Sequence, residues 1–162
     1  MQTQQGVFSQ RQLAQQKYAT ARANLLIMLV LTLLNIVLLF LDANIMLLFS
    51  ATVPYYVAAF GFGAPLNIFL IPCLILAGIC LLAYFICWVL SKNHYGWMIA
   101  ALVLFGIDTL VLVSVSLLVL DFSGIIDIAF HAWVLYYLGI GVNYGHALRT
   151  LPEEAAPPAA EA

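Results

Sequence analysis

Hydrophobic residues in this chain gather into long runs with few or no charges, unlike the spaced apolar stripes of soluble helices. The first run, residues 25–41, has 17 residues without a charge. Three longer runs follow it: residues 66–90 carry no charge, residues 97–120 carry only Asp108, and residues 125–148 carry Asp127. A transmembrane helix needs about 20 apolar residues, with a lower limit near 17, to cross roughly 30 Å of hydrocarbon. The pattern therefore predicts an all-α transmembrane four-helix bundle within residues 25–148.

One further apolar segment, residues 45–60, does not fit this series. It has 16 residues, with Ser50 and Thr52 inside it and Pro54 near its middle. The sequence Gly-Phe-Gly-Ala-Pro follows at residues 61–65 and should end any helix there. Hydropathy alone allows a short fifth span, whereas its length and interruption equally allow a re-entrant or interfacial segment.

The basic residues decide between four spans and five. The chain has five, namely Arg11, Lys17, Arg22, Lys92 and Arg149. With four spans all of them lie on one side of the membrane, as the positive-inside rule expects, whereas five spans would place Lys92 and Arg149 outside. We therefore expect residues 45–60 to be re-entrant or interfacial and both termini to lie in the cytoplasm, with the bundle in the plasma (cytoplasmic) membrane.

The two ends of the chain are predicted to lie outside the membrane. Residues 1–24 are polar and rich in Gln, and form a cytoplasmic N-terminal segment. Residues 149–162 are rich in Ala, Pro and Glu, and such low-complexity sequence is typical of a disordered tail.

Composition supports a lipid environment and excludes other partners. Hydrophobic residues make up 65% of the chain and charged residues 7%, against roughly 45–50% and about 25% in soluble proteins. The net charge of −2 leaves no basic surface for nucleic acid. Cys73, Cys80 and Cys87 recur every seven residues, about 10.5 Å apart along one helix, too far apart to share a metal. No cofactor-binding motif is present, and we expect neither metal nor cofactor.

Four spans carry a polar or helix-breaking residue at a similar depth. Asn35, Pro72, Ser114 and His131 each lie six residues from the predicted outer end of their span, roughly 9 Å deep. We expect Pro72, like Pro54, to kink its helix. This layer predicts a water-accessible vestibule in the outer half of the bundle, capped by residues 45–60.

The candidates for proton or ligand binding are Asn35 and Ser114 of this layer together with three titratable residues, Asp108, Asp127 and His131. Asp127 and His131 are separated by four residues and share a helix face, so the acid can fix the tautomer of the imidazole. Asp108 lies near the bilayer midplane, where an ionised Asp costs on the order of 3 kcal/mol, and we expect it to be protonated and hydrogen-bonded to a neighbouring helix. The same depth estimate puts His131 roughly 9 Å shallower, beyond direct contact with Asp108 unless the helices tilt. Structural pairing and proton coupling both remain open for these residues.

The last span contains a Gly-x-x-x-Gly motif, Gly141 and Gly145, which allows close helix packing within the chain or with a second copy. The favoured function is therefore that of a non-enzymatic membrane protein acting through helix contacts, as a homo-oligomer or as the accessory subunit of a membrane protein partner. The alternative is a small proton-coupled transporter or channel that uses Asp108, Asp127 and His131. A membrane enzyme is the least favoured class, and we assign no catalytic residue. An Asp108 facing the interior beside Asn35 or His131 would favour the transport alternative.

Overall fold

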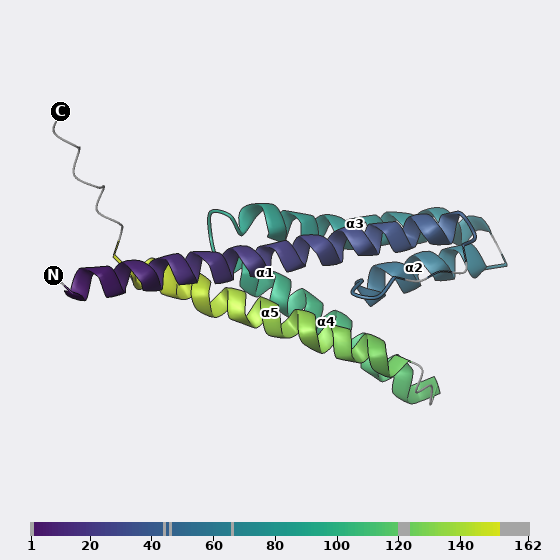
Figure 1. The fold of residues 1–162 in the computed structure, drawn as a ribbon. Coiled ribbons are helices and arrows are strands. Elements are labelled where there is room, and N and C mark those ends of the chain that lie inside the picture. Colours follow the sequence, from purple (N-terminus) through teal and green to yellow (C-terminus); the bar gives the residue numbers. More distant parts are fainter. Residues whose placement is uncertain (1, 44, 46, 66, 120–123, 153–162) are drawn as a thin grey trace.

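The structure, a computed structural model, describes residues 2–43, 45, 47–65, 67–119 and 124–152, and its regular elements are all helices (Figure 1). The elements are α1 (Gln2–Phe40), α2 (Thr52–Gly63), the short 3-10 helix η1 (Asn67–Phe69), α3 (Leu70–Leu90), α4 (Gly96–Val119) and α5 (Ile125–Thr150). The four long helices α1, α3, α4 and α5 are apolar enough to cross a membrane. The prediction of an all-α bundle with four such helices is confirmed.

The helices form two pairs that diverge toward one end of the molecule. One pair is α1 with α3 and the other is α4 with α5. The two pairs contact each other through α1 with α5 and through α3 with α4. Figure 1 shows α4 and α5 running obliquely away from α1 and α3, so that the bundle opens like a fork. The short helix α2 lies in this fork, packed mainly against α3 and also touching α1 and α4.

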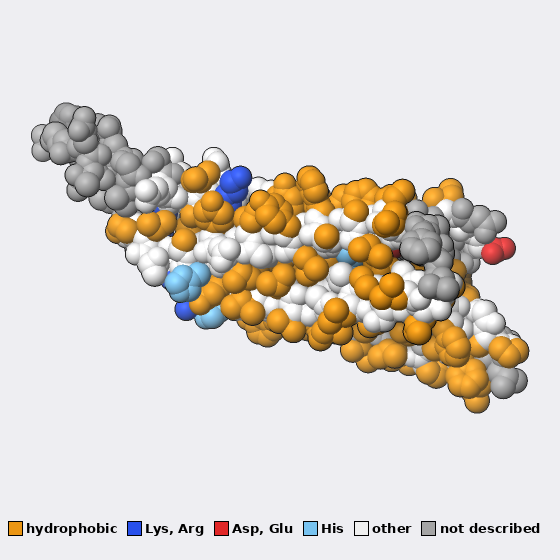
Figure 2. Space-filling model, turned by 90° about the horizontal axis from the view of Figure 1, so that it is seen from below, with side chains coloured by type: hydrophobic (Ala, Val, Ile, Leu, Met, Phe, Trp, Pro, Cys, Tyr) orange, Lys and Arg blue, Asp and Glu red, His pale blue; other side chains and the backbone are white. Residues whose placement is uncertain are grey.

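The two ends of the bundle differ in charge. Arg11, Arg22 and Arg149 contact Leu151, Ser91 and Tyr95, which brings the first half of α1, the turn after α3 and the end of α5 together. We call this the basic end, and the opposite end, where α1 finishes at Phe40, the forked end. On the face shown in Figure 2, Lys and Arg side chains lie only toward the basic end and an acidic side chain toward the forked end.

The core is narrow and made largely of small or flexible side chains. Its fully buried members include Ala21, Leu25, Met98, Ala101 and Phe105. The outer faces of the helices are apolar as well, with side chains such as Leu118 at 84% exposure (Figure 2). A continuous apolar exterior of this kind is expected where lipid is the solvent.

Two helices extend beyond the predicted spans. α1 starts at Gln2, so the polar N-terminal segment continues the first span as helix, and Ala14 and Ala21 on it are buried. α5 runs through Thr150, two residues into the predicted tail, while residues 153–162 of that tail lie outside the described residues.

The chain between α1 and α3 enters and leaves the bundle at the forked end. It turns back after α1, with positive φ angles of 53° at Asp42 and 67° at Phe49. Ala51 N donates a hydrogen bond to Thr32, two turns before the end of α1. Phe62, near the end of α2, packs on Phe40, the last residue of α1, with 5.7 Å between ring centroids. Irregular chain therefore runs inward and α2 runs outward (Figure 1).

Both prolines expected to kink a helix stand instead in the first turn of one. Pro54 is the third residue of α2 and Pro72 the third residue of α3. The first-turn N–H groups of a helix have no intrahelical acceptor, so proline removes no hydrogen bond there. The expectation of a mid-helix kink was wrong because both helices begin later than hydropathy indicated.

Candidate functional site

A buried carboxylate holds the start of α2. Asp108 on α4 is 2% exposed, and each of its oxygens accepts one backbone N–H from α2. Thr52 N lies 2.8 Å from Oδ2, and Val53 N lies 2.7 Å from Oδ1. The N-cap residue of α2, Ala51, has no side chain that could cap, so Asp108 supplies this function from another helix. A negative charge at a helix N-terminus is also favoured by the helix dipole.

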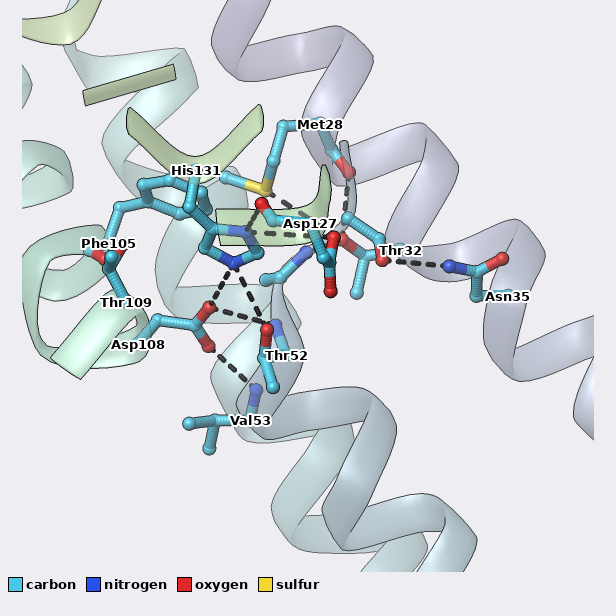
Figure 3. A network of polar contacts seen from close by, with 12 residues as sticks. Met28, Thr32, Asn35, Thr52, Val53, Phe105, Asp108, Thr109, Asp127 and His131 are labelled. Atoms are coloured by element: carbon cyan, nitrogen blue, oxygen red, sulfur yellow. Dashed lines mark hydrogen bonds and ion pairs between the residues drawn. The ribbon is translucent and has the colours of Figure 1, made fainter. Parts of the chain in front are cut away.

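The imidazole of His131 on α5 completes the cluster (Figure 3). Its Nε2 lies 3.2 Å from Asp108 Oδ2 and 3.0 Å from Thr52 Oγ1. Its Nδ1 lies 2.9 Å from the backbone oxygen of Asp127. The ring stacks on Phe105, with centroids 4.9 Å apart and planes 11° from parallel. His131 is only 1% exposed, so its ring is in contact with protein and shielded from solvent.

The hydrogen bonds fix where protons can lie. A carbonyl oxygen only accepts, so His131 Nδ1 must donate to the Asp127 oxygen. The close approach of Nε2 to Asp108 Oδ2 then needs one further proton between these two atoms. One proton is thus shared by the imidazole and Asp108, whose two oxygens also accept the backbone N–H groups of Thr52 and Val53.

Asp127 extends the cluster toward the forked end. Its Oδ1 lies 3.8 Å from His131 Nδ1 and is buried without a hydrogen-bond partner. Its side chain is nevertheless 13% exposed, compared with 1% for that of His131. Asp127, His131 and Asp108 therefore form a row of titratable groups, from a partly exposed carboxylate to a buried one.

Two polar residues of α1 hold the irregular segment that leads into α2. Asn35 Nδ2 donates to Leu47 O and to Ser50 Oγ, both at 2.8 Å, while its Oδ1 accepts from Leu47 N at 2.7 Å. One turn away, Thr32 Oγ1 accepts from Ala51 N at 2.7 Å. Backbone within an apolar environment needs such partners, and α1 supplies them in place of water.

The structure unites some of the sequence-predicted residues and separates others. Asn35, Asp108 and His131 contact residues 47–53, and Asp127 contacts His131. Ser114 is exposed and donates to Leu110 O of its own helix. Pro72 is exposed at the start of α3. The predicted layer of four polar groups therefore reduces to Asn35 and His131.

The estimated gap between Asp108 and His131 was wrong, because the two side chains touch at 3.2 Å. The estimate treated every helix as perpendicular to the membrane, whereas α4 and α5 run obliquely to α1 and α3 (Figure 1). From the rise per residue, the two residues were expected to differ in depth by roughly 9 Å. Helix tilt and the length of the two side chains together close this difference.

The glycine pair of α5 packs within the chain. A Cβ at Gly141 would lie 2.6 Å from Ala21 Cβ, and one at Gly145 would lie 2.7 Å from Tyr95 Cβ. Both distances are shorter than real Cβ contacts allow, so these glycines let α1 and the start of α4 approach α5. Because both glycines are buried within the chain, they present no surface on which a second copy could pack.

An apolar cavity lies beside the cluster. It has a volume of about 250 Å³ and is lined by Pro54 of α2, Cys80 and Tyr84 of α3, and Ile107 and Asp108 of α4. Tyr84 and Cys80 are thus the titratable residues that α3 presents near Asp108. No group of three or more His, Cys, Asp or Glu among the described residues could hold a metal ion.

Sequence reasoning missed Thr52 and Thr32 as members of the site. One signal for Thr52 was available, because proline in the sequence Thr-Val-Pro marks a helix start as readily as a kink. Thr32 gave no signal, since a threonine in an apolar helix usually bonds its own backbone, as Thr32 also does to Met28 O.

Comparison with protein-family models, curated proteins and solved structures finds no significant match to this chain.

Proposed function

We propose that this chain is a small proton-coupled transporter or channel of the cytoplasmic membrane, in which Asp108 changes protonation and Asp127 with His131 forms the outer proton route. The observation that carries the proposal is the position of Asp108. It is buried inside a single chain, in contact with His131 and with the backbone of the segment that enters and leaves the bundle at one end. An oligomer interface would instead leave Asp108 exposed on the surface of the monomer.

The orientation proposed for the bundle rests on its charges. The contacts of Arg11, Arg22 and Arg149 bring the first half of α1, the end of α5 and the turn containing Lys92 together at the basic end. The positive-inside rule assigns that end to the cytoplasm. The forked end then faces outward, residues 45–63 form a re-entrant segment, and Asp127 is the first titratable group of the row met from outside.

Proton transfer through this row has a direct structural consequence. The proton between His131 Nε2 and Asp108 Oδ2 can move onto the carboxyl group. Nδ1 keeps the proton that it donates to Asp127 O, so a proton on Asp127 reaches the ring only when that hydrogen bond breaks and the ring turns its free nitrogen toward Asp127. Protonated Asp108 has lost its negative charge and accepts the two N–H groups of α2 less strongly. The start of α2 is then held less firmly, so that proton occupancy is coupled to the position of the re-entrant segment.

The test is proton flux into proteoliposomes that contain a pH-sensitive dye, driven by an imposed pH gradient. Asp108→Asn should abolish flux, because the amide cannot take up a proton. Ser114→Ala, on the outer surface of the same helix, is the matched control and should conduct like the wild type. Unchanged flux in folded Asp108→Asn, or the absence of flux in the wild type, would remove the proposal.

A milder variant keeps the test informative if Asp108→Asn fails to fold. Asp127→Asn changes an oxygen that already lacks a hydrogen-bond partner, so the fold should tolerate it. It should slow flux while leaving thermal stability close to that of the wild type. Wild-type flux in this variant would show that protons do not enter through Asp127.

Action through helix contacts is the second candidate, and one observation supports it. The α4–α5 pair diverges from the bundle, and Leu117, Leu118 and Val119 on it are 68%, 84% and 68% exposed. A partner helix could pack there. A photo-crosslinking residue at position 118 should then capture a protein in native membranes, and capture of lipid alone would count against this function.

A further inference from the structure

A second cavity lies at the basic end, far from the Asp108 cluster. It has a volume of about 140 Å³ and is formed by the turn between α3 and α4 together with α1 and α5. Its polar lining includes Ser91, Lys92 and His94 from the turn and Arg149 from α5. Since about 10–15 Å³ of such space is enough to admit one water molecule, this cavity has room for a phosphate with its oxygens.

The walls of this cavity are fixed by contacts with α1. Tyr18 Oη donates to Ser91 O at 2.5 Å, and Arg22 Nε donates to Ser91 Oγ at 3.0 Å. Gly145 forms part of the wall, where a Cβ would meet Tyr18 Cε2 at 2.8 Å and Tyr95 Cβ at 2.7 Å. The turn is therefore held in place before any ligand binds, which lowers the entropic cost of binding.

The lining is rich in donors for an anion. Lys92 and Arg149 are cations, and Arg149 is oriented by Tyr95, whose ring centroid lies 4.9 Å from its guanidinium carbon. His94 Nδ1 accepts from Gly96 N at 3.0 Å, so a neutral His94 carries its proton on Nε2 and can donate from there. No acidic residue lines the cavity among the residues that the structure describes.

We infer that this cavity binds the phosphate of an anionic phospholipid from the leaflet at the basic end. Its position favours a lipid over a free anion. It lies where the four apolar helices end, beside Tyr95 and the 39% exposed Trp97, and aromatic side chains of this kind mark the headgroup level. A phospholipid whose phosphate lies in the cavity can pack its acyl chains along the apolar outer faces of the helices, so one molecule satisfies both surfaces.

The experiment titrates the full chain, in a neutral detergent, with short-chain phosphatidylglycerol and follows binding by native mass spectrometry. Phosphatidylglycerol should bind at least tenfold more tightly than phosphatidylcholine of the same chain length. Arg149→Gln and Lys92→Gln should each remove most of this preference. Lys17→Gln is the matched control, since Lys17 is an exposed cation of the same region that does not line the cavity.

Two outcomes overturn the inference. Equal loss of the preference in Lys17→Gln would show attraction to the general charge of this end and no specific site. Glycerol 3-phosphate or inorganic phosphate that competes at the same concentration as the lipid would show that a free anion is the ligand. Neither result bears on proton flux, so this site and the proposed transport function stand or fall separately.

Discussion

The basic end and the forked end of this bundle are held together by different kinds of contact. At the basic end helices approach closely over glycine, as where Gly141 meets Ala21 and Gly145 meets Tyr18. At the forked end the helix pairs diverge, and side chains of α1 and α4 accept or donate hydrogen bonds to the backbone of residues 47–53. One end depends on steric fit and the other on buried polar groups.

This difference separates a rigid region from one that can respond to a proton. Steric packing over glycine does not depend on charge, because the atoms that meet there are carbon atoms of Ala21, Tyr18 and Tyr95. The contacts of Asp108 do change, since its charge sets how strongly it accepts the N–H groups of α2. In the proposed transporter, one fixed end and one charge-dependent end would allow α2 to move without loss of the fold.

Among the substitutions that test this difference between the two ends, Asp108→Ala should lower the free energy of unfolding most. It leaves His131 and two backbone N–H groups of α2 buried without their acceptor. Breaking a buried charged pair on one side costs about 3–5 kcal/mol, and we expect a loss of that size in the free energy of unfolding, measured by detergent titration. A loss below about 1 kcal/mol, the level expected of Ser114→Ala, would mean that Asp108 does not hold α2.

The next largest effect is expected from substitutions at the basic end. Gly141→Ala and Gly145→Ala force a Cβ to within 2.6 and 2.7 Å of neighbouring carbon atoms, and overpacking of this kind costs about 1–3 kcal/mol per site. Gly139→Ala is the matched control on the same helix, because nothing lies within 4 Å of its added Cβ. The control should stabilise by roughly 0.5–1 kcal/mol, since alanine is the better helix former. Equal effects at all three glycines would refute close packing at this end.

A local effect is expected from Asn35→Ala. It removes the partner of Leu47 N and Leu47 O, which are only part-buried, so the two losses together should cost no more than the roughly 1–3 kcal/mol of one fully buried group left without a partner. Because the forked end is held separately, amide hydrogen exchange should speed up in residues 47–53 and stay unchanged in the turn at residues 91–95. Faster exchange in both regions would show that the two ends are one cooperative unit.

The sequence was sufficient to predict the helices but not the contact on which the site depends. Long apolar runs with few or no charges gave the all-α class and the four apolar helices, because lipid leaves few alternatives. The spacing of Asp127 and His131 predicted their shared face. The cost of an acid at that depth predicted a hydrogen-bonded Asp108, but neither its burial within the chain nor its partners followed from the sequence.

Those partners were hidden because they are backbone groups placed by an unusual turn. The return of the chain after α1 uses positive φ angles at Asp42 and Phe49, where no glycine marks the turn. Residues before Thr52 are as apolar as those within α2, so hydropathy gives no sign that the helix starts there. A helix N-terminus stabilises a negative charge, so a helix that starts inside the bundle suits an acid with no buried Lys or Arg nearby.

The smallest effect is expected from Pro72→Ala, and its sign tests where α3 begins. In the interior of a helix proline is about 3 kcal/mol less favourable than alanine, so a kinking proline at this position would make Pro72→Ala strongly stabilising. In the first turn proline removes no hydrogen bond and restricts the unfolded chain, so its replacement should cost about 0.4–1 kcal/mol. Detergent titration of the unfolding equilibrium distinguishes these signs, with Pro54→Ala as a second first-turn site, on α2. Stabilisation by more than about 1 kcal/mol would place Pro72 inside a longer helix and contradict the start of α3 at Leu70.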